Sequence, residues 1–201
     1  MSKNAMLNGL LERRWVVSTL LESRGNLLVI SGLGSAVWDI TAAGDHPLNF
    51  PVWGAMGAAS TIGLGLALAQ PERPVLVVTG DGEMLMQLGA LATIGVQRPR
   101  NLSIVVLDNE CYCETGMQKT HTASGVNLME IAQACGIECA SVARVPKDVT
   151  DIRDTLHSCT RVLFSQIKIA PNKPALMMPP RDGSYLKDRF RTALLGPSAV
   201  D

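Results

Sequence analysis

The chain has 201 residues, of which 47% are hydrophobic and 18% are charged, and these values predict a single compact domain with one well-covered core. Eighteen lysine and arginine residues balance eighteen aspartate and glutamate residues, so no excess of charge favours a nucleic acid or an anionic membrane surface as partner. Only 4% of the residues are aromatic, which argues against base-stacking platforms and favours a small-molecule ligand.

Residues 1–14 mix polar and charged side chains with scattered leucines. No uncharged apolar run in the chain reaches the roughly 18 residues that a membrane span requires. The five cysteines are an odd number in a chain without a recognisable signal peptide, which favours reduced thiols over a disulfide framework. These features predict a soluble, unexported protein of the cytoplasm.

Hydrophobic spacing predicts strands that alternate with helices. Leucine and valine residues between Leu7 and Leu21 recur at helical spacing and predict a first helix that ends at Gly25. Short apolar runs predict interior parallel strands, and the longer segments between them predict helices. The predicted strands are residues 27–31, 75–79 and 102–107, and the predicted helices are residues 54–70, 84–97 and 127–135.

The last third of the chain is less regular. Apolar residues near 149–156 predict another helix, residues 174–178 a final strand and residues 184–195 a terminal helix. The alternation predicts right-handed crossovers and a doubly wound α/β fold, with a mostly parallel sheet and helices on both faces. Ligands of such folds bind at the carboxyl ends of the strands. We expect residues 1–201 to form one such domain, with a C-terminal extension over about 180–201.

A carboxylate flanked by glycines follows the second predicted strand, in Gly80-Asp81-Gly82-Glu83. Gly80 and Gly82 let the backbone approach a ligand closely, and the helix that follows offers free N–H groups to a phosphate. An ordinary tight turn is the alternative for Asp-Gly taken alone. The next predicted strand ends at Asn109, and Asp81 and Asn109 can share a metal ion if the two strands are neighbours. Carboxylate, amide and backbone carbonyl oxygens suit Mg²⁺ or Ca²⁺ and not zinc.

Gly80-Asp81-Gly82 followed by Asp108-Asn109 resembles the signature of the thiamine-diphosphate-dependent enzymes, which is Gly-Asp-Gly followed downstream by an asparagine pair or its variant. The resemblance implies thiamine diphosphate and Mg²⁺ as cofactors. It also implies that Asp81, Asn109 and the main-chain carbonyl of Cys111 bind the metal. Asp108 stands where the family more usually has its first asparagine, and this departure leaves the implied metal ligand in place.

Two upstream turns extend the resemblance. In Gly54-Ala55-Met56-Gly57, the family places a bulky apolar residue that supports the bent cofactor, so Met56 is expected in that role, with tight helix packing as the alternative. Gly32-Leu33-Gly34-Ser35 predicts another phosphate-contacting turn. A Rossmann dinucleotide turn competes with this interpretation, but Val37 stands where its third glycine should be. The implied cofactor contacts are Gly32, Gly34, Ser35, Gly54, Met56, Gly80, Asp81, Gly82, Glu83, Asn109, Cys111 and Tyr112.

The stretch from Asp108 to Thr122 resembles the small subunits of sulfopyruvate and phosphonopyruvate decarboxylases. This resemblance implies non-oxidative decarboxylation of a 2-oxo acid. Carboligation, as in acetolactate-synthase-like proteins, and a catalytically silent subunit are the alternatives. His121 lies within the stretch and is the candidate for moving a proton or binding an acidic substrate group, whereas a loop histidine bonded to backbone is the alternative.

The family also requires a glutamate that activates the aminopyrimidine ring, at the far end of the cofactor from the diphosphate. Glu83, Glu110 and Glu114 are all expected near the diphosphate end. In the family, the activating glutamate comes from a separate pyrimidine-binding domain, and this chain has the length of only one domain. The resemblance therefore implies a heteromeric enzyme in which a partner subunit supplies the glutamate.

The cysteines raise one further alternative. Cys111 and Cys113, with Cys135 and Cys139, would suggest an iron–sulfur cluster and hence a 2-oxo acid oxidoreductase. Their spacing matches neither the usual zinc runs nor the ferredoxin runs. Small buried hydrophobic side chains are the preferred interpretation.

Overall fold

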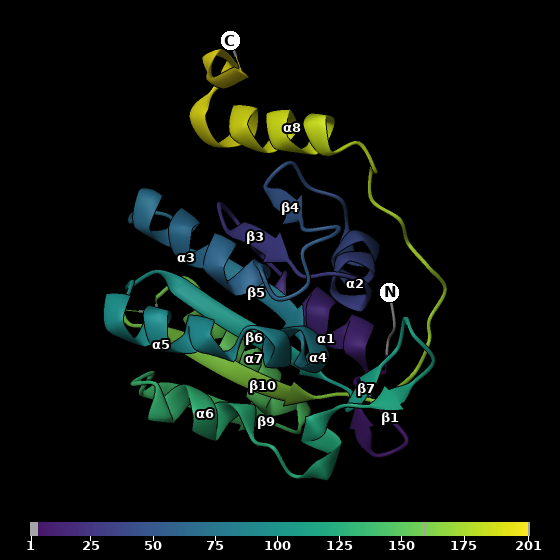
Figure 1. The fold of residues 1–201 in the computed structure, drawn as a ribbon. Coiled ribbons are helices and arrows are strands. Elements are labelled where there is room, and N and C mark those ends of the chain that lie inside the picture. Colours follow the sequence, from purple (N-terminus) through teal and green to yellow (C-terminus); the bar gives the residue numbers. More distant parts are fainter. Residues whose placement is uncertain (1–3, 159, 201) are drawn as a thin grey trace.

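The computed structural model describes residues 4–158 and 160–200, so the predicted domain's ends, residues 1–3 and 201, lie outside the described residues, as does residue 159. Its centre is a six-stranded parallel sheet in the order β4-β3-β5-β6-β10-β9 (Figure 1). The strands are β3 (Leu28–Ser31), β4 (Asn49–Pro51), β5 (Val75–Gly80), β6 (Leu102–Asp108), β9 (Cys139–Ala143) and β10 (Leu163–Lys168). The predicted parallel sheet is confirmed.

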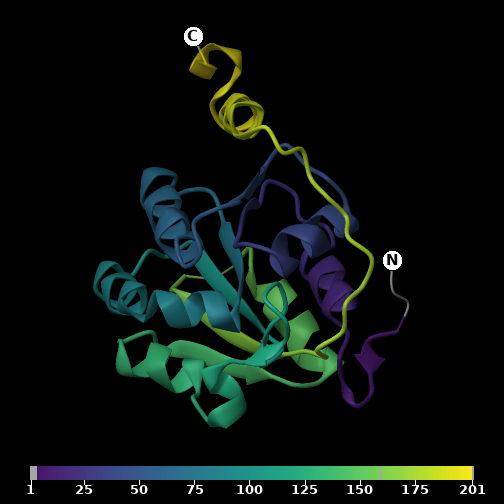
Figure 2. The same ribbon diagram turned by 45° about the vertical axis from the view of Figure 1, so that its right-hand side comes forward.

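Helices cover both faces of the sheet (Figure 2). The strands are apolar on both sides, and successive residues point to opposite faces: Val75 and Val77 pack in one cluster, Leu76 and Val78 in the other. Residues of α1 (Arg13–Leu20), α2 (Ser35–Ala43) and α7 (Pro146–Thr155) complete one cluster. Residues of α3 (Ala59–Ala69), α4 (Asp81–Met86), α5 (Leu88–Gln97), α6 (Leu128–Ala134) and α8 (Gly183–Leu195) complete the other. The fold is therefore the expected doubly wound α/β class.

The chain leaves the neighbouring strands β3 and β5 toward opposite faces of the sheet. The turn after β3 leads into α2 on one face, whereas the turn after β5 leads into α4 on the other. The chain therefore diverges beyond the carboxyl ends of the two strands, and a crevice lies between the two turns. This crevice is where the ligand site is expected.

Three predicted helices have different bounds in the structure. The helix predicted over residues 54–70 begins only at Ala59, after Gly57 with its positive φ of 89°. The first helix does not include residues 7–11, because Asn8 and Gly9 adopt positive φ angles of 51° and 80° in the turn between β1 (Met6–Leu7) and β2 (Leu10–Leu11). The left-handed region interrupts a right-handed helix. The helix predicted over residues 84–97 begins earlier, at Asp81, and is divided at Gln87, whose φ of −132° is not helical.

The predicted final strand is wrong. Residues 174–178 have no regular secondary structure, and the last strand is β10. Prolines at 174, 179 and 180 remove backbone donors that a strand needs, and β10 takes the central place between β6 and β9. The prediction from apolar spacing missed β10 because the polar residues Gln166 and Lys168 interrupt its apolar run. The fold nevertheless buries or nearly buries both side chains.

The terminal helix α8 is confirmed. An extended segment carries the chain from β10 along the molecule to α8, which lies against the edge strand β4 (Figures 1 and 2). Phe190 packs edge-to-face on Phe50 at 5.4 Å between ring centroids, and Arg189 pairs with Asp45 at 2.6 Å. Smaller elements are β7 (Cys111–Tyr112), β8 (Gln118–Lys119), η1 (His121–Ser124) and η2 (Pro197–Val200). Across residues 4–158 and 160–200, no helix has the length and apolar character of a membrane span.

Two glycines of α3 test the close packing of this helix on the sheet. A Cβ atom on Gly63 would lie 2.2 Å from Val77 Cγ2, whereas a Cβ atom on Gly65 would meet nothing within 4 Å. Gly63→Ala should lower the free energy of unfolding by about 1–3 kcal/mol through overpacking. Gly65→Ala should raise it by about 0.5–1 kcal/mol through helix propensity. Urea unfolding of both variants measures the difference, and equal effects would contradict the packing argument.

Candidate functional site

A cavity of about 370 Å³ opens at the carboxyl edge of the sheet. It lies among the turns that follow β3, β5 and β6, and it contains most of the residues predicted from the sequence. Its lining includes Gly34, Ser35, Met56, Gly80, Asp81, Gly82, Glu83, Asn109, Cys111 and Tyr112. Among its lining residues, the charged side chains are all acidic, namely Asp81, Glu83 and Glu114.

Asp81 is, with Glu83, one of two buried carboxylates of this cavity, and its relative exposure is 2%. Its Oδ2 accepts hydrogen bonds from the hydroxyl groups of Thr120, at 2.5 Å, and Thr122, at 3.2 Å. Burial raises the pKa of Asp81 to about 6, and the negative charge of Asp108 adds to this rise, while the hydrogen bonds from both threonines oppose it. No lysine, arginine or histidine of the described residues pairs with Asp81, so no basic side chain among them compensates its negative charge.

Asn109 lies in the next turn, since β5 and β6 are neighbours and Gly80 is paired with Leu107. Its Oδ1 accepts a hydrogen bond from the Cys111 backbone N–H at 3.0 Å, and its Nδ2 contacts Cys113 Sγ at 2.8 Å. This local ring fixes the Cys111 peptide close to the Asn109 amide. The structure therefore brings the turns carrying Asp81, Asn109 and the Cys111 carbonyl to one edge of the sheet, as the strand order predicted.

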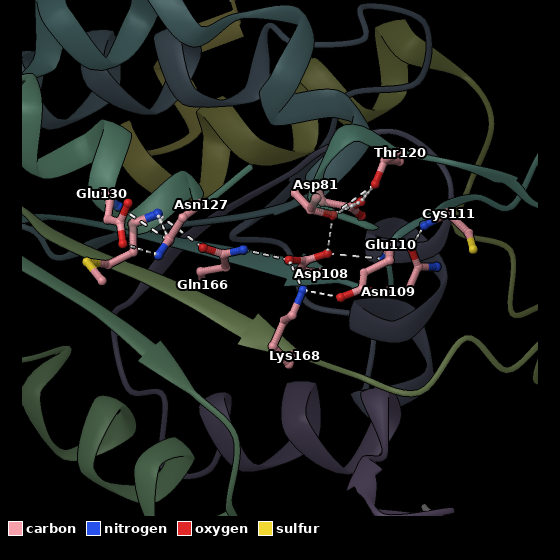
Figure 3. Close-up of polar contacts among 12 residues, drawn as sticks. Asp81, Asp108, Asn109, Glu110, Cys111, Thr120, Asn127, Glu130, Gln166 and Lys168 are labelled. Carbon is pink, nitrogen blue, oxygen red and sulfur yellow. Dashed lines mark hydrogen bonds and ion pairs between the residues drawn. The ribbon is translucent and has the colours of Figure 1, made fainter. Parts of the chain in front are cut away.

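The local charges favour a divalent cation. Asp108 is buried, and its carboxylate lies close enough to raise the pKa of Asp81. Lys168 donates to Asp108 Oδ2 at 2.8 Å and to Glu110 Oε1 at 2.5 Å (Figure 3). Burial lowers the pKa of Lys168, but the bonds and charges of these two carboxylates outweigh burial and leave this pKa raised. Asp81, Asp108 and Glu110 in their ionised forms exceed the charge of Lys168 by two, and their oxygens suit a hard cation.

Glu83 links three turns at the cavity. Its Oε1 accepts a hydrogen bond from Gly57 N at 3.1 Å, and its Oε2 accepts one from Thr79 Oγ1 at 2.7 Å. Burial raises the pKa of Glu83, whereas hydrogen bonds from Thr79 and from the backbone of Gly57, Leu33 and Gly80 oppose the rise. The absence of a side chain at Gly32 makes room for this carboxylate, because a Cβ atom there would lie 1.7 Å from Glu83 Oε2.

Two other glycines of the site have different surroundings. A Cβ atom on Gly82 would lie 2.3 Å from Tyr112 Cε1, so the missing side chain lets the Tyr112 ring pack over the turn. A Cβ atom on Gly54 would meet nothing within 4 Å, and the structure shows no close approach at that position. Gly82 thus makes room for the Tyr112 ring of the same chain, whereas contact of Gly54 with a cofactor stays a prediction.

Methionines form part of the apolar wall of the cavity. Met56 lines it, as predicted, together with Leu33, Leu107 and Met86. Met86 is 60% exposed although it lines the cavity, so the cavity wall continues onto the molecular surface. Sequence reasoning missed Met86 because its helical spacing suits an ordinary core position.

His121 is exposed on η1 and is not among the residues that line the cavity. Its neighbours Thr120 and Thr122 are buried and turn toward Asp81 instead. The role of His121 in moving protons therefore stays a prediction. The period-2 alternation of an extended segment does not account for the two inward threonines, because His121–Ser124 is a 3-10 helix.

The cysteine pairs lie at opposite edges of the sheet. Cys111 and Cys113 line the cavity at the carboxyl edge. Cys139 begins β9 and is paired with Leu163 at the start of β10, and Cys135 caps α6 nearby. The four residues are therefore placed as two separate pairs, and a single cluster bound by all of them does not fit this arrangement.

The raised pKa of Asp81 predicts a pH dependence of stability in the metal-free chain. Because the folded pKa of about 6 exceeds the unfolded value, this group stabilises the fold fully below about pH 4, and the contribution is lost as pH rises through 6. As the pH rises from 4 to 7, the free energy of unfolding of Asp81→Asn should therefore increase by about 1–3 kcal/mol relative to that of the parent. Urea unfolding at each pH, in the presence of a metal chelator, measures this difference in the free energy of unfolding. The exposed Asp151→Asn is the control, and parallel pH profiles for Asp81→Asn and the parent would contradict the prediction.

Comparison with known proteins agrees with this geometry. The family model described as "Thiamine pyrophosphate enzyme, C-terminal TPP binding domain" matches residues 34–164. Sulfopyruvate decarboxylase subunit beta of Methanocaldococcus jannaschii is 35% identical over 182 residues, which cover 89% of this chain and 95% of that one. Phosphonopyruvate decarboxylase of Streptomyces viridochromogenes is 36% identical over 181 residues, which cover 90% of this chain and 45% of that one.

A solved structure shows the same fold. The benzoylformate decarboxylase of Polynucleobacter necessarius superposes with a TM-score of 0.75 and 17% identity, over 87% of this chain and 36% of that one. The matched family region contains both the Gly80-Asp81-Gly82 turn and Asn109. The chain belongs to the thiamine pyrophosphate enzymes, through the C-terminal TPP-binding domain of that family.

Proposed function

We propose that the chain is the diphosphate- and metal-binding subunit of a heteromeric thiamine-diphosphate-dependent decarboxylase that acts on a 2-oxo acid with a second acidic group. The observation that carries the proposal is the buried carboxylate Asp81, which lacks a cationic partner in the described chain and lies beside Asn109 in the cavity. The names of the relatives, sulfopyruvate and phosphonopyruvate decarboxylases, support the acidic substrate class.

The residues at the cavity fit the cofactor and its metal. Asp81, Asn109 and the Cys111 carbonyl would hold Mg²⁺, because this set supplies only oxygen atoms. Gly34, Ser35, Gly80 and Gly82 would contact the diphosphate, since they line the cavity in the turns that open α2 and α4. Met56 would support the bent cofactor from the apolar wall. Glu83 would maintain the shape of the site, because its hydrogen bonds connect the turns that carry these groups.

Thiamine diphosphate, when bound, supplies the electron sink that allows a 2-oxo acid to lose its carboxylate as carbon dioxide. The chain's own residues position and desolvate this chemistry. Leu33, Met56 and Met86 exclude water from one side of the cavity. His121 is the proposed proton carrier, and its exposed position would require the neighbouring subunit or the substrate to cover it.

A partner subunit with a pyrimidine-binding domain would complete the site. Chain lengths support this: the sequence spans 95% of a relative named as a beta subunit but only 45% of a relative that is a single, longer chain. The exposed Met86 at the cavity supports it as well, because a partner would cover this apolar side chain. The activating glutamate would come from that partner, since Glu83 is already occupied by donors of its own chain.

We also propose the organisation and location of the chain. Residues 1–201 would form one cofactor-binding domain, and the segment from about 180 onward, which includes α8, would be its C-terminal extension. The packing of α8 on β4 supports treating it as part of that domain. A cytoplasmic location is supported by the unpaired thiols Cys111, Cys113, Cys135 and Cys139.

Calorimetry with thiamine diphosphate and Mg²⁺, with the partner subunit present, tests the metal ligands. Asp81→Ala should weaken Mg²⁺-dependent binding by at least about 100-fold, because it removes the charged ligand of a hard cation. Cys111→Ala is the matched control, since the proposed ligand is a main-chain carbonyl, and it should bind nearly as the parent does. Equal binding by the parent and Asp81→Ala would overturn the metal site.

Product analysis tests the reaction. The chain together with its partner should convert sulfopyruvate or phosphonopyruvate to carbon dioxide and the corresponding aldehyde, whereas the chain alone should show little turnover. A carboligated product would favour an acetolactate-synthase-like activity. Cofactor binding without turnover beside any partner would favour a silent subunit, and strong turnover by the chain alone would contradict the need for a partner.

A further inference from the structure

Lys168 stands at the end of β10 with its ammonium group directed at the turn that carries Asn109 (Figure 3). Its Nζ donates to Asp108 Oδ2 at 2.8 Å and to Glu110 Oε1 at 2.5 Å. These two acceptors are the residues on either side of Asn109. The Lys168 and Asp108 side chains are 13% and 0% exposed, so their contact is shielded from solvent, whereas the Glu110 side chain is half-exposed.

The backbone of this turn needs such support. Glu110 has a φ of 62°, in the left-handed region, which is unfavourable for a residue with a Cβ atom. Two bonds hold it there: Glu110 N donates to Asp108 Oδ1 at 3.1 Å, and Thr120 N donates to Glu110 O at 2.9 Å. Lys168 adds a link between the side chains of Asp108 and Glu110, and this link restrains the position of Asn109, which lies between them in the chain.

The same network reaches Asp81. Asp108 Oδ2 also accepts from Gln166 Nε2 at 2.6 Å, and Asp108 Oδ1 accepts from Thr122 Oγ1 at 2.8 Å. The Thr122 hydroxyl lies 3.2 Å from Asp81 Oδ2 as well. The two buried carboxylates therefore share the Thr122 hydroxyl, and Lys168 is the cation that neutralises one of them, Asp108. Without that cation, the charge of Asp108 would be uncompensated next to Asp81.

We propose that Lys168 is a positioning residue of the cation site: by bridging the side chains of Asp108 and Glu110, it holds the turn that presents Asn109 and the Cys111 carbonyl to the cation. Lys168 itself does not touch the cation. This inference rests on the proposed function, because the site must bind a metal.

The test measures Mg²⁺ binding by calorimetry, with the full chain, its partner subunit and saturating thiamine diphosphate. Lys168→Met should weaken Mg²⁺ binding by roughly 10- to 100-fold, the range typical of residues that support metal ligands. Lys168→Arg should stay within about 5-fold of the parent, because its guanidinium still pairs with carboxylates. The double variant Asp108→Asn/Lys168→Met also lacks the bridge but leaves no buried charge unpaired, so it should bind Mg²⁺ about as weakly as Lys168→Met. Lys147→Met, at an exposed ion pair, is the control.

The arms of the experiment separate the possible failures. A residue that only supports the fold would lower the unfolding midpoint of the metal-free Lys168→Met chain without changing its Mg²⁺ affinity, and that result would overturn the proposal. A double variant that binds Mg²⁺ within about 5-fold of the parent would overturn it too, because that variant also lacks the bridge. If Lys168→Met does not fold, the double variant and Lys168→Arg still decide the question. Failure of the parent chain to bind Mg²⁺ would instead reject the proposed metal site.

Discussion

Two buried carboxylates, Asp81 and Asp108, lie at the ends of neighbouring strands and share the hydroxyl group of Thr122, and Asp81 also accepts a hydrogen bond from Thr120. Lys168 compensates one of these charges, and no side chain of the described residues compensates the other. Placing an uncompensated carboxylate at 2% exposure is costly unless a ligand neutralises it. The polar groups around the cavity are arranged about this one constraint, which a divalent cation bound to a diphosphate would satisfy.

The fold makes this concentration of charge possible. Parallel strands bring the ends of β3, β5 and β6 to one edge, and the divergence of the chain between β3 and β5 opens the crevice there. Glu83 then joins the turns after β3 and β5 to the Met56 turn, so the glycines around the cavity are positioned relative to one another. The apolar wall and its exposed Met86 face outward, toward the surface that the proposed partner would cover.

Local sequence predicted those parts of the site that depend on neighbouring residues. Gly80-Asp81-Gly82 and Asn109 were found because each follows an apolar strand, and strands of this kind end at a common edge. The prediction for the Thr120-His121-Thr122 segment was less complete: it selected the histidine, whereas the structure turns the threonines inward and leaves His121 exposed. Side-chain type indicates which chemistry is available, but the direction in which a loop residue points depends on what lies beneath the loop.

Alternating apolar runs and helical spacings in the sequence by themselves determined the α/β class, and the glycine-flanked aspartate indicated the edge of the sheet at which the cavity lies. Only the tertiary structure decided that β10 lies beside β6, which brings Lys168 to Asp108 across 60 residues of chain. The sequence could not show this, because Gln166 and Lys168 are polar and make β10 resemble an exposed segment. Their burial is tolerated only because the folded chain supplies Asp108 and Glu110 as partners, and such long-range pairing leaves no local pattern.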